Sequence, residues 1–164
     1  MSIASVGLRT SNLTTTQASL ELRTTASVKA RVLEVSLVQA TATAASYGLG
    51  RPAAQGVTPA TTSTFQRDDS ADPACVTTAS LTWGTSPTAP TSYHRRWNSA
   101  ATIGVGIIWT FPRGLIVPVS ASLVVFNITT VVACDATDKD SVKSVLLALL
   151  YSVLDEIEAE AAHA

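Results

Sequence analysis

The spacing of apolar residues changes once along this chain of 164 residues, and that change constrains the fold more than any other feature. Before residue 134 the apolar residues lie in short segments, and residues 33–37 alternate strictly between apolar and polar. A period of two indicates a strand with one buried face. After Asp135 the apolar residues recur every three or four positions, which is typical of a helix. We therefore predict an all-β main body with an appended C-terminal α-helix.

Further segments of strand-like composition follow the first, and they are separated by residues that interrupt a β-ladder. They cover residues 42–50, 75–83, 92–97, 103–111 and 122–130. Gly56 and Pro59 predict a loop up to residue 59, and Pro112 with Gly114 predicts a turn that ends the strand before it. Roughly seven or eight strands at this short spacing predict a sandwich, a barrel or a jelly roll.

The length fits one domain with an appendage, because domains commonly run about 100 to 150 residues. The Ser/Thr-rich residues 1–17 predict an extended N-terminal arm. We assign residues 18–134 to a β-sandwich domain. Residues 135–164 form the predicted amphipathic helix, which Asp138 or Asp140 can cap.

The predicted helix carries an apolar face that needs a partner. Its residues at helical spacing are Val142, Leu146, Leu149, Val153 and Ile157. Neighbouring leucines and valines widen this face beyond a narrow stripe, so the body or sister helices must cover it. These five residues are therefore interface candidates. The apolar run is far shorter than the roughly 20 residues that cross a bilayer, so we expect no membrane partner.

The charges of the chain are segregated, although its formal net charge is only −1. Residues 1–134 carry nine Lys/Arg and five Asp/Glu, whereas residues 135–164 carry two and seven. Such asymmetry is typical of an interaction tail, and an acidic solvated helix face explains it equally well. The excess of positive charge in the body is too small for a nucleic-acid-binding protein, so we expect no nucleic acid partner.

No residue pattern indicates catalysis, a cofactor or a metal site. The chain has two histidines, His94 beside two arginines and His163 at the C-terminus, and neither belongs to a catalytic motif. Asp68, Asp69 and Asp72 lack the ligand spacing of a calcium loop, so a solvated turn is the simpler interpretation. We therefore expect a protein that is not an enzyme, with no catalytic, cofactor-binding or metal-ligating residues.

The cysteines and the N-terminus bear on the cellular compartment. Cys75 and Cys134 are isolated, without the C-x-x-C spacing of zinc or redox sites, and whether they pair is left open. The first residues show no basic segment followed by an apolar one, so no secretory signal is expected and synthesis in the cytoplasm follows.

Arg95 and Arg96 precede Trp97 in a predicted strand, and two interpretations of this run stand side by side. In the first, the arginines belong to a protein interface and bind carboxylates. In the second, Trp97 lies in the core and the arginines alternate about it, because adjacent residues of a strand point to opposite faces. Trp109 and Phe111 are two residues apart, and we expect both to anchor the core.

Several segments together resemble small β-rich structural proteins encoded by tailed bacteriophages, of the decoration or cement kind. The resemblance covers residues 29–130. Its segments are Arg31-Val32-Leu33-Glu34-Val35-Ser36, Gly50-Arg51-Pro52, Asp69-Ser70-Ala71-Asp72-Pro73-Ala74, Arg95-Arg96-Trp97-Asn98 and the run from Gly106-Ile107-Ile108-Trp109 to Leu115. The acidic C-terminal segment is not part of this pattern.

The resemblance implies a jelly-roll-like β-sandwich that belongs to a virion. It also implies that the protein is a homo-oligomer, for which a trimer is one candidate. The implied partners are the major capsid protein or other virion proteins, and the implied location is the head surface. The N-terminal arm, the region of Arg95 and Arg96, and the helix would then supply the contacts. A tail or fibre component is the alternative within this class.

An alternative from another class is a carbohydrate- or host-surface-binding module, because β-sandwich folds support both roles. Trp83, Tyr93 and Trp97 on one solvent-facing patch would favour it.

Overall fold

The computed structural model describes residues 3–10 and 17–128, and every regular element within them is a β-strand. In chain order the strands are β1 (Ala4–Ser5), β2 (Ala18–Arg23), β3 (Ala30–Val38), β4 (Ala45–Gly50), β5 (Val57–Thr64), β6 (Gln66–Arg67), β7 (Thr78–Thr85), β8 (Tyr93–Ser99), β9 (Gly106–Val117) and β10 (Ser122–Asn127). The main body is therefore all-β, as predicted. The predicted C-terminal helix and its apolar residues lie outside the described residues.

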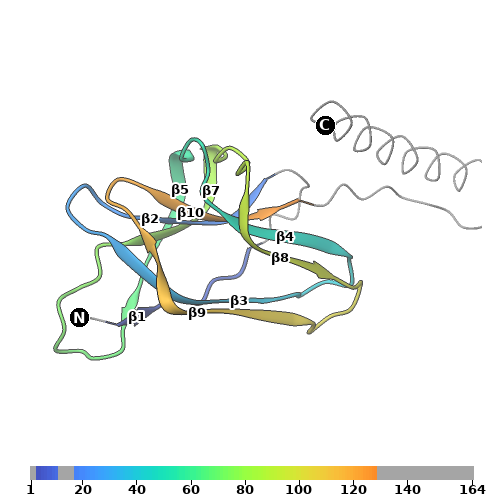
Figure 1. The fold of residues 1–164 in the computed structure, drawn as a ribbon, viewed down its shortest axis with the longest axis horizontal. Coiled ribbons are helices and arrows are strands. Elements are labelled where there is room, and N and C mark those ends of the chain that lie inside the picture. Colours follow the sequence, from blue (N-terminus) through green and yellow to red (C-terminus); the bar gives the residue numbers. More distant parts are fainter. Residues whose placement is uncertain (1–2, 11–16, 129–164) are drawn as a thin grey trace, which may run out of the picture. The chain divides into compact units, whose positions relative to one another are not determined.

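The strands form three antiparallel sheets. The largest has six strands in the order β5-β7-β2-β10-β4-β8, while β3 pairs with β9 and β1 pairs with β6. Figure 1 shows the β3-β9 ribbon running below the sheet that contains β4 and β8. Because β1 pairs with β6, part of the predicted N-terminal arm is bound to the body of the same chain.

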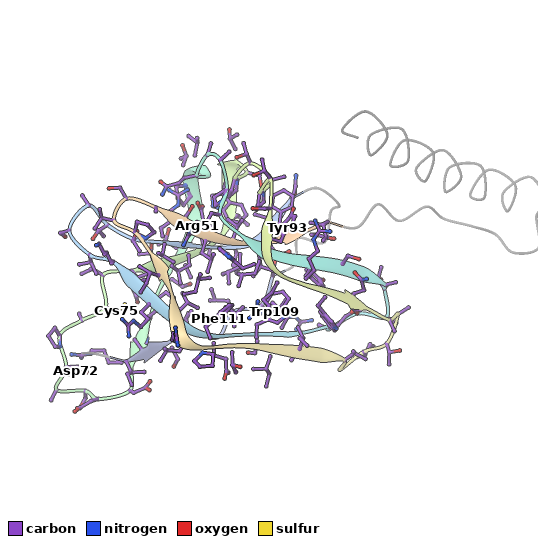
Figure 2. The ribbon with its side chains drawn as sticks, viewed as in Figure 1. Arg51, Asp72, Cys75, Tyr93, Trp109 and Phe111 are labelled. Carbon is purple, nitrogen blue, oxygen red and sulfur yellow. The ribbon has the colours of Figure 1, made fainter. Side chains whose placement is uncertain are left out.

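The main hydrophobic core lies between the six-stranded sheet and the β3-β9 ribbon. Its buried residues are Val32, Ala45, Tyr47, Leu49, Trp109, Val117, Leu123 and Val125. Phe111 packs against this cluster and Trp109 belongs to it, as predicted from their spacing, and Figure 2 shows both on β9. Alternation along β9 and β10 places these side chains on one face, which explains the two-layer packing.

The opposite face of the six-stranded sheet has its own small core, in which loops replace a second sheet. Ala18, Val124 and Phe126 are buried there, with Trp83 and Tyr93 packed against them. The Tyr93 ring lies over Gly48 of the neighbouring strand, where a methyl group would collide with it. A glycine covered by a cross-strand aromatic side chain is a recognised way to fix strand register.

Residues 57–64 correct one prediction, because they form β5 although Gly56 and Pro59 indicated a loop. Pro59 is tolerated because β5 is an edge strand of the sheet. The register of β5 against β7 also shifts on the C-terminal side of Pro59, so the ladder accommodates the missing N–H.

The prediction that Pro112 and Gly114 end a strand is also wrong, since β9 continues to Val117. Pairing with β3 stops after Thr110 and resumes at Leu115, so four residues of β9 bulge opposite a single residue of β3. Pro112 therefore needs no ladder partner. Gly114 adopts a φ of 71°, which glycine reaches without steric cost, and so the chain bends there without ending.

Candidate interaction surface

Strand β8 places the two predicted arginines on opposite sides of the six-stranded sheet. The Arg95 guanidinium carbon lies 5.3 Å from the centre of the Phe111 ring, whereas that of Arg96 lies 4.9 Å from the centre of the Tyr93 ring. Trp97 packs against the main core and stacks on Tyr47 with 6.0 Å between ring centres. The interpretation in which Trp97 packs in the core and the arginines alternate about it describes the geometry, and both arginine side chains are exposed.

Two further arginines approach the part of β9 that Arg95 contacts. Arg51 follows β4 and donates a hydrogen bond of 2.9 Å to the Ile116 carbonyl. Arg31 is paired with Ile116 in the ladder, and its side chain lies against Gly114. Arg31, Arg51 and Arg95, called here the arginine cluster, thus come from three separate segments to residues 111–116 of β9.

His94 reports on the electrostatics of this cluster. Partial burial lowers the pKa of His94 below its usual value of 6.5, and the positive charges of Arg51 and Arg95 lower it further. A cation close to an imidazole disfavours its protonated form. Burial is the largest cause of this shift, and the contributions of Arg51 and Arg95 place both of their charges close enough to act on His94.

Within the part of the chain that the structure describes, no carboxylate lies within ion-pair distance of the cluster. In residues 3–10 and 17–128 the only ion pair joins Glu21 and Arg23. Glu21 is fully buried on the other face of the sheet, and three of the remaining four carboxylates of the body belong to the loop around Asp69. Figure 2 shows that loop, labelled at Asp72, at the far end of the β-body from Tyr93. The arginine cluster is therefore free to bind an anionic group from outside the body.

Aliphatic side chains occupy the outer surface of the β3-β9 ribbon. Val38 of β3 is 73% exposed and Ile108 of β9 is 62% exposed, with Leu33 and Ile116 exposed to a lesser extent. Scattered single apolar residues are ordinary on protein surfaces, but several on one narrow ribbon favour contact with another surface.

A buried polar network involves residues that the sequence reasoning missed. Glu21 of β2 accepts hydrogen bonds from Trp83 Nε1 at 2.7 Å, from Arg23 Nη2 at 2.8 Å and from the Gly56 amide at 3.3 Å. Arg23 Nη2 also donates to the Gly56 carbonyl. The sequence did hold one signal for this network. In Leu20-Glu21-Leu22-Arg23, charged residues alternate with leucines.

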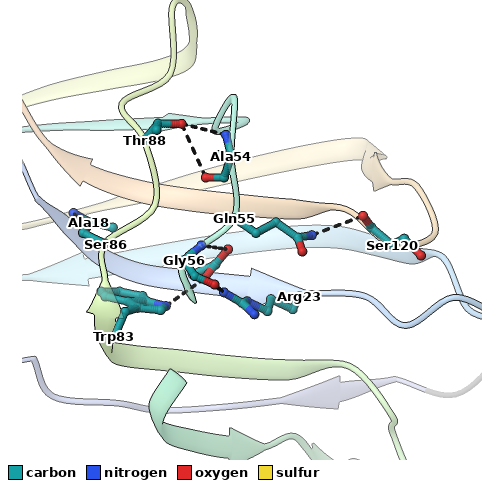
Figure 3. Close-up of polar contacts among 10 residues, drawn as sticks. Ala18, Arg23, Ala54, Gln55, Gly56, Trp83, Ser86, Thr88 and Ser120 are labelled. Atoms are coloured by element: carbon teal, nitrogen blue, oxygen red, sulfur yellow. Dashed lines mark hydrogen bonds and ion pairs between the residues drawn. The ribbon is translucent and has the colours of Figure 1, made fainter. Parts of the chain in front are cut away.

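This network fixes the loop after β4 against the sheet, as the close-up in Figure 3 shows. The same loop is tied to the segment before β8, because the Ala54 amide donates to Thr88 Oγ1 at 2.7 Å and the Thr88 amide donates to the Ala54 carbonyl at 3.1 Å. Since Arg51 begins this loop, the Glu21 network also helps to position one member of the arginine cluster.

The three aromatic side chains that would suit a glycan-binding platform do not share a patch. Trp83 and Tyr93 pack in the small core, and the Trp83 indole N–H bonds to Glu21. Trp97 packs in the main core on the opposite face of the sheet. These three residues therefore do not form the exposed aromatic patch that would favour the carbohydrate-binding alternative.

Among the residues that the structure describes, no group of three or more His, Cys, Asp or Glu side chains is arranged to hold a metal ion. Within the same residues, no helix has the length and apolarity needed to span a bilayer. Cys75 is partly buried beside Thr77, while its potential partner Cys134 lies outside the described residues.

Comparison of the chain with protein-family models, with curated proteins and with solved structures gives no match. The geometry therefore defines a class only. The described residues form an all-β body that carries an exposed aliphatic ribbon and an arginine cluster with no carboxylate within ion-pair distance.

Proposed function

We propose that this chain is a non-enzymatic structural protein of a tailed-bacteriophage virion that binds the head surface as a decoration or cement protein. The resemblance of residues 29–130 to such proteins supports the proposal. The finer fold that we propose is a jelly-roll-like sandwich, and the location that we propose is the virion, after synthesis in the host cytoplasm.

The observation that carries the proposal is the outer surface of the β3-β9 ribbon. Its exposed aliphatic side chains offer apolar area for contact with another protein, and we assign the head contact to this surface. The sparse charge of the chain, 14% against roughly 25% in ordinary soluble proteins, also suits a subunit whose surface is covered in an assembly. Binding to the folded state alone would add to the stability of the subunit.

Quantitative mass spectrometry of particles from the phage that encodes the chain tests this function. Heads and tails are separated first, and copies of the chain are counted in each fraction. Abundant copies with heads support decoration. A few copies with tails would replace decoration by the tail or fibre alternative, and absence from both fractions would overturn the virion assignment.

A variant pair tests the assigned surface. The double variant Val38→Asp/Ile108→Asp places charges on the ribbon, and a charged group buried in an apolar contact is costly, so we expect head binding about tenfold weaker or more. Thr62→Asp/Thr85→Asp puts two charges on exposed positions of β5 and β7 that do not face each other in the ladder, and it is the matched control. Equal loss in both variants would contradict the assignment of the contact to the ribbon.

A further inference from the structure

We propose that the arginine cluster binds the acidic C-terminal segment of a second copy of this chain. The proposal goes beyond head binding, since it concerns contact between copies and holds whatever surface the assembled protein meets.

The first step of the argument is the arrangement of the cations. Arg51 is anchored by its hydrogen bond to the Ile116 carbonyl and Arg95 lies over the Phe111 ring, so both guanidinium groups are held beside β9, and both charges act on His94. Arg31 is the ladder partner of Ile116, on the outward face of the β3-β9 ribbon. Arginine binds carboxylates through two parallel N–H groups, and anchoring reduces the conformational entropy lost when it does so.

The second step is the missing counter-charge. In the described residues no carboxylate lies within ion-pair distance of any member of the cluster. A ligand for this region should therefore carry several negative charges close together.

The third step is the chemistry of the occupant. Residues 155–160 contain Asp155, Glu156, Glu158 and Glu160, and no Lys or Arg lies C-terminal to them. This segment is the densest group of carboxylates in the sequence, and it lies C-terminal to the five apolar residues at helical spacing that require a partner.

Charge-swap variants of the full chain test the proposal by analytical ultracentrifugation over a range of salt concentrations. Arg51→Glu/Arg95→Glu should weaken self-association about tenfold or more at low salt, as should Asp155→Lys/Glu156→Lys/Glu158→Lys/Glu160→Lys. Combining both sets restores opposite charges and should recover much of the association. Arg9→Glu/Lys29→Glu changes the same number of charges at exposed positions outside the cluster, so it is the matched control and should associate like the unaltered chain.

Recovery in the combined variant is the decisive result, because a mere effect on folding or on helix stability would not be reversed by a second set of charge changes. Circular dichroism of each variant verifies the fold. A monomeric unaltered chain, unchanged association of Arg51→Glu/Arg95→Glu, or no recovery in the combined variant would each overturn the proposal. Binding to heads is not measured here, so this failure is distinct from failure of the proposed function.

Discussion

At the scale of single residues, Glu21 is the clearest case in which a charged side chain shapes the structure. Its carboxylate satisfies the indole of Trp83, the amide of Gly56 and the guanidinium of Arg23 at once. A buried charge is tolerated only when its partners are fully arranged around it, so the network specifies the position of the loop after β4.

Glu21→Ala should therefore lower the free energy of unfolding by about 3 kcal/mol, because it leaves Arg23 and the Trp83 and Gly56 N–H groups without their acceptor. Urea denaturation measures the change. Glu34→Ala removes an exposed carboxylate from β3 and should stay within about 0.5 kcal/mol. Equal effects of the two substitutions would show that the Glu21 network does not stabilise the fold.

His94 gives a second test at the same scale. Burial and the charges of Arg51 and Arg95 lower its pKa, so its NMR titration midpoint should fall below 6.5. Arg51→Gln/Arg95→Gln should raise the midpoint without fully restoring 6.5, because burial remains, and Arg67→Gln should leave it unchanged. A midpoint at or above 6.5 in the unaltered chain would contradict the described geometry.

The sign of the linked stability effect follows from the same shift. The unfolded chain binds a proton at His94 more readily than the folded chain does. The contribution of His94 to stability is therefore fully present above pH 6.5, the usual pKa of histidine. It is lost as the pH falls from 6.5 towards the lower pKa that His94 has in the folded state. His94 is largely exposed, so this dependence should be shallow.

At the scale of elements, the fit between β4 and β8 depends on Gly48. A methyl group there would collide with the Tyr93 ring, so Gly48→Ala should cost about 1 to 3 kcal/mol in thermal or urea unfolding. Gly7→Ala is the matched control, since no atom lies within 4 Å of the added methyl, and it should change stability by less than about 0.5 kcal/mol. If the two substitutions behave alike, the packing of Tyr93 over β4 is not as described.

The alternation of residues 33–37 and the segments of strand-like composition over β4, β8 and β10 predicted strands that the structure confirms. The two errors both involve proline. Pro59 lies in an edge strand and Pro112 lies in a bulge, and neither place is visible locally because strand order and register depend on distant partners. The sequence identifies a proline as a residue that interrupts a ladder, but it does not show that this proline lies in an edge strand or a bulge, where a proline is tolerated.

The candidate surface was predictable only in part, because it also depends on pairing between segments that are far apart in sequence. Arg95 and Arg96 stood out because they are adjacent, and alternation correctly placed them on opposite sides of the strand. Arg31 and Arg51 joined the cluster only through pairing between segments far apart in sequence. The role of Glu21 likewise depends on Trp83, which is 62 residues away along the chain.

At the scale of the whole molecule, the central question is how copies of the chain assemble and on what surface. The apolar residues that we predict on the C-terminal helix should contribute to assembly, so Leu146→Asp/Leu149→Asp should shift the full chain towards monomer by light scattering. Leu81→Val, a small change at a half-buried side chain of β7, is expected to leave the oligomeric state unaltered. Unchanged mass in the leucine double variant would refute a role of this face in assembly.

The claim that the chain decorates a phage head is tested most directly by adding purified full-length protein to heads that lack it and measuring cosedimentation. The account predicts saturable binding with many copies per head, weakened by Val38→Asp/Ile108→Asp and not by Thr62→Asp/Thr85→Asp. Absence of binding at protein concentrations well above those in an infected cell would contradict the account.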